Sequence, residues 1–438
     1  MVFDIVIHNG TIITVNPDFD IIEDGIVCIK DGRIEQIEAR PASLSHIEAK
    51  EMIDAKGGIV MPGLVNTHTH LPMTLFRGLA DDLPLQVWLN EHIFPAEGKH
   101  INPESVMLGS LLACAEMILS GTTTCCDGYF FEDEVASAVY MSGMRAVLGQ
   151  GVIDFPAPGV PDPSSNIKNA VAFTEKWKEL SPLITPSIFC HSPYTCSIET
   201  LKKAKDAAAS QGLLFQIHAA ETRTEQEQIQ SEHQTTPVQL LDRIGILDQN
   251  TLLVHTIWVD DDDIETIAKR RAKISHNPES NMKLASGIAP VADFIKAGIR
   301  VGLGTDGCAS NNNLDLFQEM DMTAKLHKVN ALDPTVMDAR TVLKMATIGG
   351  AKAIGLDKDI GSLEIGKQAD LIIIDIDKPH LVPMYNPVSH IVYSVRGSDV
   401  RDVLVAGRIL TRDHKLLSID LEEILAKVAE ISEVIKKT

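Results

Sequence analysis

Two histidines, His68 and His70, follow an apolar segment of strand type that spans residues 58–66. Side chains on a strand alternate between its two faces, so residues at i and i+2 point the same way. Two imidazoles at one end of a strand can therefore bind the same metal ion. Because most histidines in proteins bind no metal, the pair needs further ligands from elsewhere in the chain.

Two further candidate ligands, His218 and Asp306, follow later apolar segments. Three imidazole nitrogens and one carboxylate oxygen suit Zn²⁺ or Fe²⁺ with an exchangeable water. The alternative for Asp306, which is flanked by glycines, is an ordinary turn residue. The fourth predicted strand ends in Cys190 and His191 and has no lysine that could bridge two ions as a carbamate. We therefore expect one divalent metal ion.

Glu221 lies three residues after His218, at the start of the next element. A carboxylate beside a metal ligand can supply a proton next to an activated water. The alternative is a glutamate that only stabilises a helix N-terminus through the helix dipole. The spacing alone leaves both interpretations open.

Eight apolar segments are predicted to be strands, and longer helix-like segments such as 104–119, 198–210 and 264–270 separate most of them. The predicted strands are 59–66, 122–126, 146–152, 185–190, 213–217, 251–254, 273–275 and 300–303. Eight such alternations favour an α/β fold of the (β/α)₈ TIM-barrel type over an open doubly wound sheet. Functional residues of such barrels collect at the carboxyl ends of the strands. The candidates occupy that position: His68, His70, His191, His218, His255, His276 and Asp306.

Both ends of the chain are rich in short strand-like segments. In the N-terminal part these segments flank the turn pairs Asn9-Gly10 and Asp31-Gly32. We expect residues 1–57 and 356–438 to form one small composite β-sandwich domain, and residues 58–355 to form the barrel. Apolar residues at helical spacing predict a closing helix over 421–437.

Composition limits the possible partners. The chain has 39 Lys and Arg against 60 Asp and Glu, a net charge of −21 over 438 residues. This balance disfavours binding to nucleic-acid backbones and to anionic membrane surfaces. The seven cysteines form an odd number without a C-x-x-C pair, and no signal peptide or long apolar run is evident. We expect a cytoplasmic protein.

Several motifs resemble those of known enzymes. The segments PGLVNTHTH at 62–70, SHNP at 275–278 and GTDG at 304–307, together with His218, Glu221 and His255, resemble the amidohydrolase superfamily. More narrowly, MTLFRG at 73–78, PAE at 95–97, HSPY at 191–194 and SNN at 310–312 resemble the 5′-methylthioadenosine/S-adenosylhomocysteine deaminases. The resemblance extends over nearly the whole chain. Barrels of this family often associate as homo-oligomers, so a homo-oligomer is possible.

The resemblance implies a role for each candidate. One metal ion, usually zinc, would be held by His68, His70, His218 and Asp306. Asp306 would also take a proton from the attacking water, His255 would orient that water, and Glu221 would protonate N1 of the purine. The expected reaction is hydrolytic deamination of the 6-amino group of an adenosine-type nucleoside. The resemblance leaves His276 open, either close behind the site or in a packing role.

The resemblance also predicts substrate contacts. Glu97 and His191 match positions that contact the nucleoside, Glu97 through ribose hydroxyls, and Ser310 and Gln150 are further candidates. Trp88 lies in a long segment, 71–97, that we expect to cover the substrate. Relatives that accept S-adenosylhomocysteine carry an arginine near the end of the third strand, where this chain has Gln150. An uncharged 5′ group is therefore expected.

Two rival interpretations stay open. The same pocket could serve a guanine or pterin deaminase or a triazine hydrolase. Alternatively, the barrel could be a catalytically inactive scaffold, although every expected ligand is present. A zinc site of the cytidine-deaminase type is excluded because its H-x-E and P-C-x-x-C signature is absent.

Overall fold

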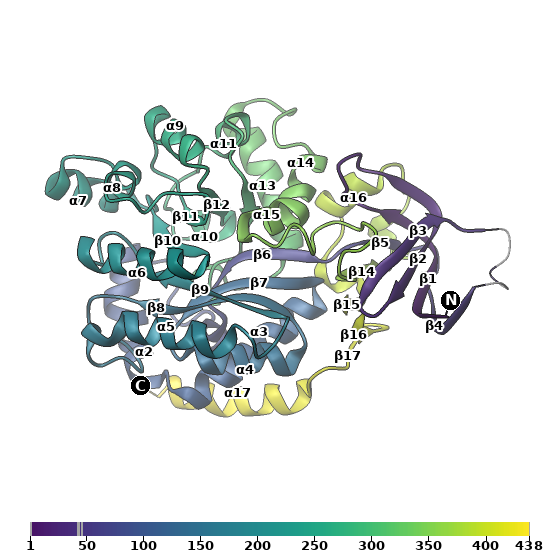
Figure 1. Cartoon of the computed structure of the whole chain (residues 1–438), viewed down its shortest axis with the longest axis horizontal. Coiled ribbons are helices and arrows are strands. Elements are labelled where there is room, and N and C mark those ends of the chain that lie inside the picture. Colours follow the sequence, from purple (N-terminus) through teal and green to yellow (C-terminus); the bar gives the residue numbers. More distant parts are fainter. Residues whose placement is uncertain (1, 42–43, 45–46, 438) are drawn as a thin grey trace.

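The computed structural model describes residues 2–41, 44 and 47–437 and has two parts (Figure 1). The larger part is an eight-stranded, nearly closed parallel barrel, which confirms the predicted architecture. Its strands are β6 (Leu64–Thr69), β7 (Thr122–Tyr129), β8 (Arg145–Val152), β9 (Ile184–Cys190), β10 (Phe215–Ala219), β11 (Thr251–His255), β12 (Lys273–His276) and β13 (Val301–Leu303). The N–H of Asp306 donates to the carbonyl of His68 at 3.0 Å, so the first and last strands meet.

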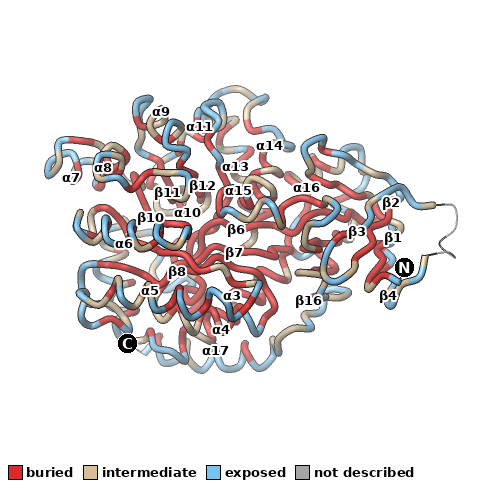
Figure 2. Tube along the Cα trace, viewed as in Figure 1, coloured by how far each residue is buried: buried red, intermediate tan, exposed pale blue. Residues whose placement is uncertain are grey.

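Helices cover the outside of the barrel, and Figure 2 shows buried strands inside a layer of partly exposed helices. Parallel strands covered on both faces are expected to be largely apolar, and every residue of β6 to β13 is buried except Thr185 in β9, which is partly exposed. The helices include α3 (Pro103–Leu119), α4 (Glu132–Ser142), α5 (Asn166–Trp177), α6 (Ile198–Gln211), α7 (Arg223–His233), α8 (Pro237–Arg243), α9 (Asp261–Arg270), α10 (Pro278–Lys283), α11 (Val291–Lys296), α12 (Cys308–Asn311) and α13 (Leu316–Ala331).

Side-chain caps set where several of these helices begin. The side chains of Asn102, Ser197 and Asp260 accept hydrogen bonds from N–H groups in the first turns of α3, α6 and α9. Such caps satisfy donors that have no partner within the helix. The loops that precede these helices at the carboxyl end of the barrel strands are therefore held at defined positions.

The second part is a nine-stranded mixed sheet contributed by both ends of the chain, as predicted. Its strands are β1 (Val2–Ile13), β2 (Ile21–Lys30), β3 (Arg33–Ala39), β4 (Glu48–Asp54), β5 (Ile59–Pro62), β14 (Leu371–Ile374), β15 (Val400–Val405), β16 (Arg408–Arg412) and β17 (Lys415–Leu416). The sheet folds back on itself, because the N–H of Ile34 donates to the carbonyl of Lys367 at 2.9 Å. A core that includes Ile7, Val27 and Ile373 fills the fold.

One predicted strand is wrong, because 59–66 is two strands in two different sheets. β5 pairs with β1 and β14 in the mixed sheet, whereas β6 begins the barrel. The change occurs at Gly63, whose N–H donates to Asp370, while the N–H of Leu64 donates to Gly121. A Cβ atom at residue 63 would lie 2.2 Å from the Thr123 side chain, so this close approach requires glycine.

The predicted C-terminal helix is present as α17 (Leu421–Ile435). It packs along α3 of the barrel (Figure 1), and its Ile424 forms a buried apolar cluster with Leu111 of α3 and Ala138 of α4. Each of the seven cysteines is buried with a free thiol. Within the described part of the chain, no helix is both long and apolar enough to cross a membrane.

Candidate metal centre and active site

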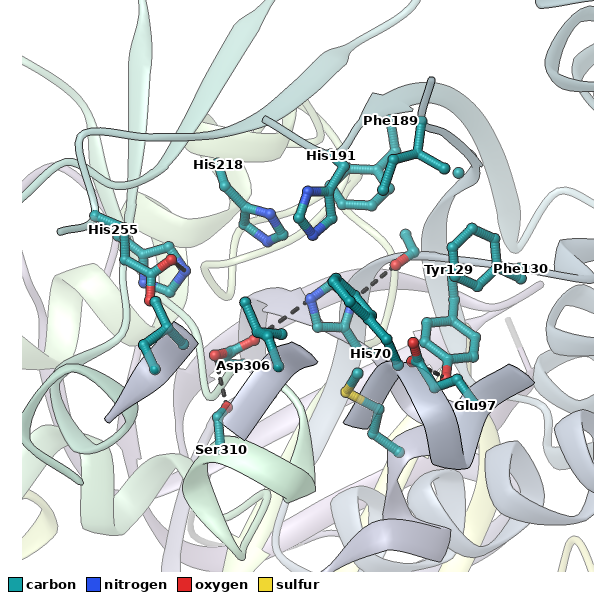
Figure 3. A pocket seen from close by; sticks show the side chains of 18 of the residues that line it. His70, Glu97, Tyr129, Phe130, Phe189, His191, His218, His255, Asp306 and Ser310 are labelled. Atoms are coloured by element: carbon teal, nitrogen blue, oxygen red, sulfur yellow. Dashed lines mark hydrogen bonds and ion pairs between the residues drawn. The ribbon is translucent and has the colours of Figure 1, made fainter. Parts of the chain in front are cut away.

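The four predicted metal ligands converge at the carboxyl end of the barrel. The Nε2 atoms of His68 and His218 lie 3.1 Å apart. Asp306 Oδ1 lies 3.4 Å from His68 Nε2 and 3.5 Å from His70 Nε2. Figure 3 shows His70, His218 and Asp306 pointing toward one another at the base of a pocket. Strands β6, β10 and the loop after β13 thus bring these donors to one place.

This arrangement fits a divalent metal ion. Ligands about 2.0–2.1 Å from a tetrahedral Zn²⁺ lie about 3.3 Å from one another, close to the observed separations. Burial lowers the pKa of His68 to about 4 and that of His218 well below its usual value, so both imidazoles are neutral. Two neutral imidazole nitrogens at this distance can share at most one proton, whereas one cation would accept a lone pair from each of them.

The backbone orients His70 for the same purpose. Its Nδ1 donates to the carbonyl of Gly128 at 2.7 Å, which leaves Nε2 directed at the centre. The residues on either side of it are held by Asp127, whose Oδ1 accepts from Thr69 Oγ1 at 2.6 Å and from the N–H of Leu71 at 2.7 Å. Asp127 was missed in the sequence, although its place late in the second barrel strand could have indicated it.

Asp306 presents one carboxylate oxygen to the histidines and the other to two serines. Its Oδ2 accepts from Ser280 Oγ and from Ser310 Oγ, both at 2.7 Å. The backbone of Asp306 has φ of 64°, a left-handed conformation that aspartate tolerates better than most residues. Ser310, a predicted substrate contact, therefore lines the cavity with its hydroxyl bonded to Asp306.

His255 and Glu221 face each other beside the histidine cluster. His255 Nε2 lies 3.9 Å from Glu221 Oε2, and His255 Nδ1 lies 2.9 Å from Asn281 Oδ1. Burial raises the pKa of Glu221, although the neighbouring His255 opposes the shift. One ring nitrogen of His255 also lies within 4.8 Å of nitrogens of His68 and His218, so His255 borders the metal centre directly.

A largely apolar cavity of about 770 Å³, including its mouth, opens above this centre. The segment that follows β6 covers it with α1 (Leu85–Val87), η2 (Trp88–Ile93) and α2 (Phe94–His100). Trp88 and Glu97 from this segment are buried and line the cavity. His191 and Ser310 line the same cavity. The predicted cover over the pocket is therefore built as a folded segment.

Glu97 and His191 both line the cavity. Tyr129 donates its hydroxyl hydrogen to Glu97 Oε1 (Figure 3), a contact that the sequence did not reveal. Burial raises the pKa of Glu97 to about 7, although the Tyr129 hydrogen bond lowers it in part. His191 Nδ1 lies 2.9 Å from Thr195 Oγ1, and burial lowers its pKa to about 3, which keeps this imidazole neutral.

Two candidates lie outside the cavity. Gln150 does not line it, because its Oε1 points toward the helix layer and accepts from the N–H of Glu132 at 3.1 Å. Gly151 and Val152, the next two residues along the chain, line the cavity instead. His276 also points away, with its Nε2 3.1 Å from His327 Nε2 in α13.

The barrel and its cluster of histidine and carboxylate ligands define an α/β-barrel protein with a site of metal-binding type. Comparison with known sequences agrees, since the profile of the amidohydrolase family matches residues 59–410. The chain belongs to the amidohydrolase family.

Individual relatives match the whole chain. A 5-methylthioadenosine/S-adenosylhomocysteine deaminase from Syntrophobacter fumaroxidans is 47% identical over 433 residues, covering 99% of this chain and 98% of the relative. A 5′-deoxyadenosine deaminase from Methanosarcina mazei is 45% identical over 431 residues, covering 98% of each. These relatives show that the resemblance seen in the motifs extends along the full length.

Solved structures give the same picture. The crystal structure of an adenosine deaminase from Xanthomonas campestris with bound zinc superposes with a TM-score of 0.97 at 35% identity, covering 100% of this chain and 99% of that one. A triazine hydrolase from Arthrobacter aurescens has a TM-score of 0.91 at 22% identity, covering 98% of this chain and 99% of that chain, which shows a shared fold alone.

Proposed function

We propose that this protein is a metal-dependent deaminase that converts the 6-amino group of an adenosine-type nucleoside to a 6-oxo group and releases ammonia. The observation that supports this proposal most directly is that Glu221, His255 and Asp306 lie around the histidine cluster, on the floor of a covered, largely apolar cavity. The relatives named as deaminases of adenosine-type nucleosides support the same reaction.

The residues that would hold the metal are His68, His70, His218 and Asp306. Zinc is the ion in the Xanthomonas structure, and the donor set would also accept Fe²⁺. When bound, such an ion makes water a nucleophile near neutral pH and polarises the reacting centre. The side chains described next would carry out the proton transfers.

Asp306 and Glu221 would act as the two proton carriers. As water adds to C6, Asp306 takes a proton from it, and Glu221 gives its proton to purine N1. When the C6–N bond breaks, Asp306 returns its proton to the departing amine, which leaves as ammonia. The oxygen at C6 loses its remaining proton to Glu221, so both carboxyl groups return to their starting states. A raised pKa suits Glu221 to the role of acid.

His255 would hold the attacking water in place. Its Nδ1 is occupied by Asn281, so Nε2 is the atom directed at the site. Glu97 and His191, which also line the cavity, would contact the sugar, and Trp88 would exclude bulk water. These contacts would place C6 of the purine next to the histidine cluster.

The cavity lining favours an uncharged 5′ group. The ring of Phe94 packs edge-on against Phe155 and His191, with centroid separations of 5.7 and 6.4 Å, and Ile153 also lines the cavity. The lining residues of the described cavity include no lysine or arginine. Arg145, at the start of β8, is committed to Asp370 with Nε–Oδ2 of 2.7 Å. A methylthio group, hydroxyl or hydrogen at C5′ would therefore fit better than a homocysteine carboxylate.

Ammonia release from a substrate panel tests the proposal. Metal-replete protein would be assayed with adenosine, 5′-methylthioadenosine, 5′-deoxyadenosine, S-adenosylhomocysteine and guanine. We expect kcat/KM for the two uncharged 5′-modified substrates to exceed that for S-adenosylhomocysteine by about tenfold or more, since an unpaired buried carboxylate costs over about 1.4 kcal/mol. Activity on guanine alone would favour the rival deaminase, and inactivity with far less than one metal per chain would favour a scaffold.

A further inference from the structure

Helix α10 places two consecutive buried side chains against groups from two different strands. Ser280 Oγ donates to Asp306 Oδ2 at 2.7 Å, on the loop after β13. The next residue, Asn281, accepts at Oδ1 from His255 Nδ1 at 2.9 Å, at the end of β11. Both side chains are almost completely buried. The strand between them, β12, ends in His276, which points away from the cavity.

The N-terminal end of α10 is held in place by hydrogen bonds to Glu319, which limits how far Ser280 and Asn281 can move. The buried carboxylate of Glu319 in α13 accepts from the N–H of Glu279 at 3.2 Å and from Asn311 Nδ2 at 2.6 Å. The same Asn311 Nδ2 donates to the carbonyl of Thr305, next to Asp306, at 2.8 Å. Glu319 and Asn311 together thus tie the start of α10 to the loop that carries Asp306.

The C-terminal end of α10 is also held in place by hydrogen bonds. Lys283 Nζ donates to Asn312 Oδ1 and to Asp81 Oδ1, both at 2.5 Å, and so links α10 to the segment that covers the cavity. Helix α10 is therefore held at both ends between the cover and the loop after β13. Its two inward side chains have little freedom to move.

We infer that Ser280 and Asn281 are positioning residues for the reaction, a role that rests on the proposed deaminase function. Ser280 turns the Asp306 carboxylate so that Oδ1 faces His68 and His70. Asn281 fixes the His255 ring with the proton on Nδ1, so that Nε2 is free to hold the attacking water. Neither residue contacts the substrate in this account, and each acts through one partner.

The two residues are expected to leave different signatures when changed. Asp306 is a metal ligand in the proposed site, so Ser280→Ala should weaken metal retention as well as turnover. His255 acts on water, so Asn281→Ala should lower turnover while metal is retained. The Nδ2 atom of Asn281 is buried and has no described hydrogen-bond partner. Asn281→Asp therefore keeps the acceptor oxygen without losing a hydrogen bond, and should recover part of the activity.

Steady-state kinetics and metal retention test these signatures. Each zinc-loaded variant would be assayed on 5′-deoxyadenosine and then dialysed against a chelator, with zinc measured over time. For both alanine variants we expect kcat to fall about 10–100-fold with KM nearly unchanged, the usual effect of removing a partner that orients a site residue. Only Ser280→Ala should lose zinc faster. Met282→Ala, on the exposed side of the same helix, is the matched control and should behave as wild type.

A double variant separates positioning from general damage to the helix. In a His255→Ala background, Asn281→Ala should cause little further loss, because its partner is already absent. A further loss as large as in the wild-type background would overturn the assignment of Asn281. If folded Ser280→Ala kept the wild-type kcat and zinc retention, the assignment of Ser280 would be overturned. If Met282→Ala lost as much kcat as the two alanine variants, both assignments would be overturned. An inactive wild-type protein would instead refute the proposed function.

Discussion

The Nε2 atoms of His68 and His218 lie 3.1 Å apart, although 150 residues separate the two histidines in the chain. Both rings are neutral because burial lowers their pKa values. Neither nitrogen can satisfy the other when both carry lone pairs. The distance between the two nitrogens is the one expected for two ligands of the same metal ion.

Replacing His218 with alanine should remove metal and activity together. Loss of about 4 kcal/mol of charge stabilisation corresponds to a fall of about 10³-fold in kcat/KM. Metal content by elemental analysis and ammonia release would be measured on the same samples. His233→Ala, on the surface helix α7, is the matched histidine control. A full equivalent of metal in folded His218→Ala would contradict the assigned ligand set.

Replacing Glu221 with glutamine should remove the acid and lower kcat by about 10²–10⁴-fold. Burial raises the pKa of Glu221, so its acid form persists to higher pH than that of an ordinary carboxyl group. Wild-type kcat should then fall as the pH rises through this raised pKa, and that limb should vanish in the variant. Glu227→Gln, an exposed change on α7, serves as control. An unchanged pH profile of kcat in Glu221→Gln would assign the acid role elsewhere.

Replacing Glu97 with glutamine should make stability less dependent on pH. Burial raises the folded-state pKa of Glu97 from 4.5 to about 7. Its stabilising contribution is fully present below about pH 4.5 and is lost as the pH rises through about 7. Relative to wild type, Glu97→Gln should therefore gain about 2–3 kcal/mol in unfolding free energy between pH 4.5 and 8.5. Urea unfolding at the two pH values measures this, and a constant difference between the proteins would disprove the buried, protonated state.

Replacing Arg145 with alanine should destabilise the fold and leave substrate preference unchanged. The guanidinium makes two hydrogen bonds to Asp370, of 2.7 and 3.1 Å, and both side chains are buried. Removing one partner of such a pair costs about 3–5 kcal/mol, because the remaining charge is buried alone. Arg223→Ala breaks an exposed pair and should cost under about 1 kcal/mol. A shifted preference among 5′ substituents would show that Arg145 reaches the substrate after all.

Local patterns in the sequence carry much of this architecture. Apolar segments bounded by turns predicted strands such as β7 and β11 close to their observed bounds, and helical periodicity predicted α3 and α6. These features depend on residues a few positions apart, so one chain segment contains the needed information. Because barrel strands are parallel, residues that follow them must lie at one end, and the sequence alone therefore predicts that His218 and Asp306 lie close together.

The direction of side chains and the pairing of strands were harder to predict from the sequence. Residues 59–66 form one uninterrupted apolar segment, yet the chain changes sheets at Gly63 because Thr123 and Asp370 approach it from distant positions. Gln150 was expected at the substrate, and the alternation of β8 turns it toward Glu132. In both cases the deciding contact comes from another part of the chain.

The order of the residues thus determined which segments become strands and which polar groups stand at their ends, since propensity and periodicity act over short distances. Only the folded chain decided that α10 would set Ser280 on Asp306 and Asn281 on His255. It also decided that Tyr129 would hold Glu97. These contacts join groups that lie 26 to 32 residues apart and exist only once the barrel has brought separate strands and loops into register.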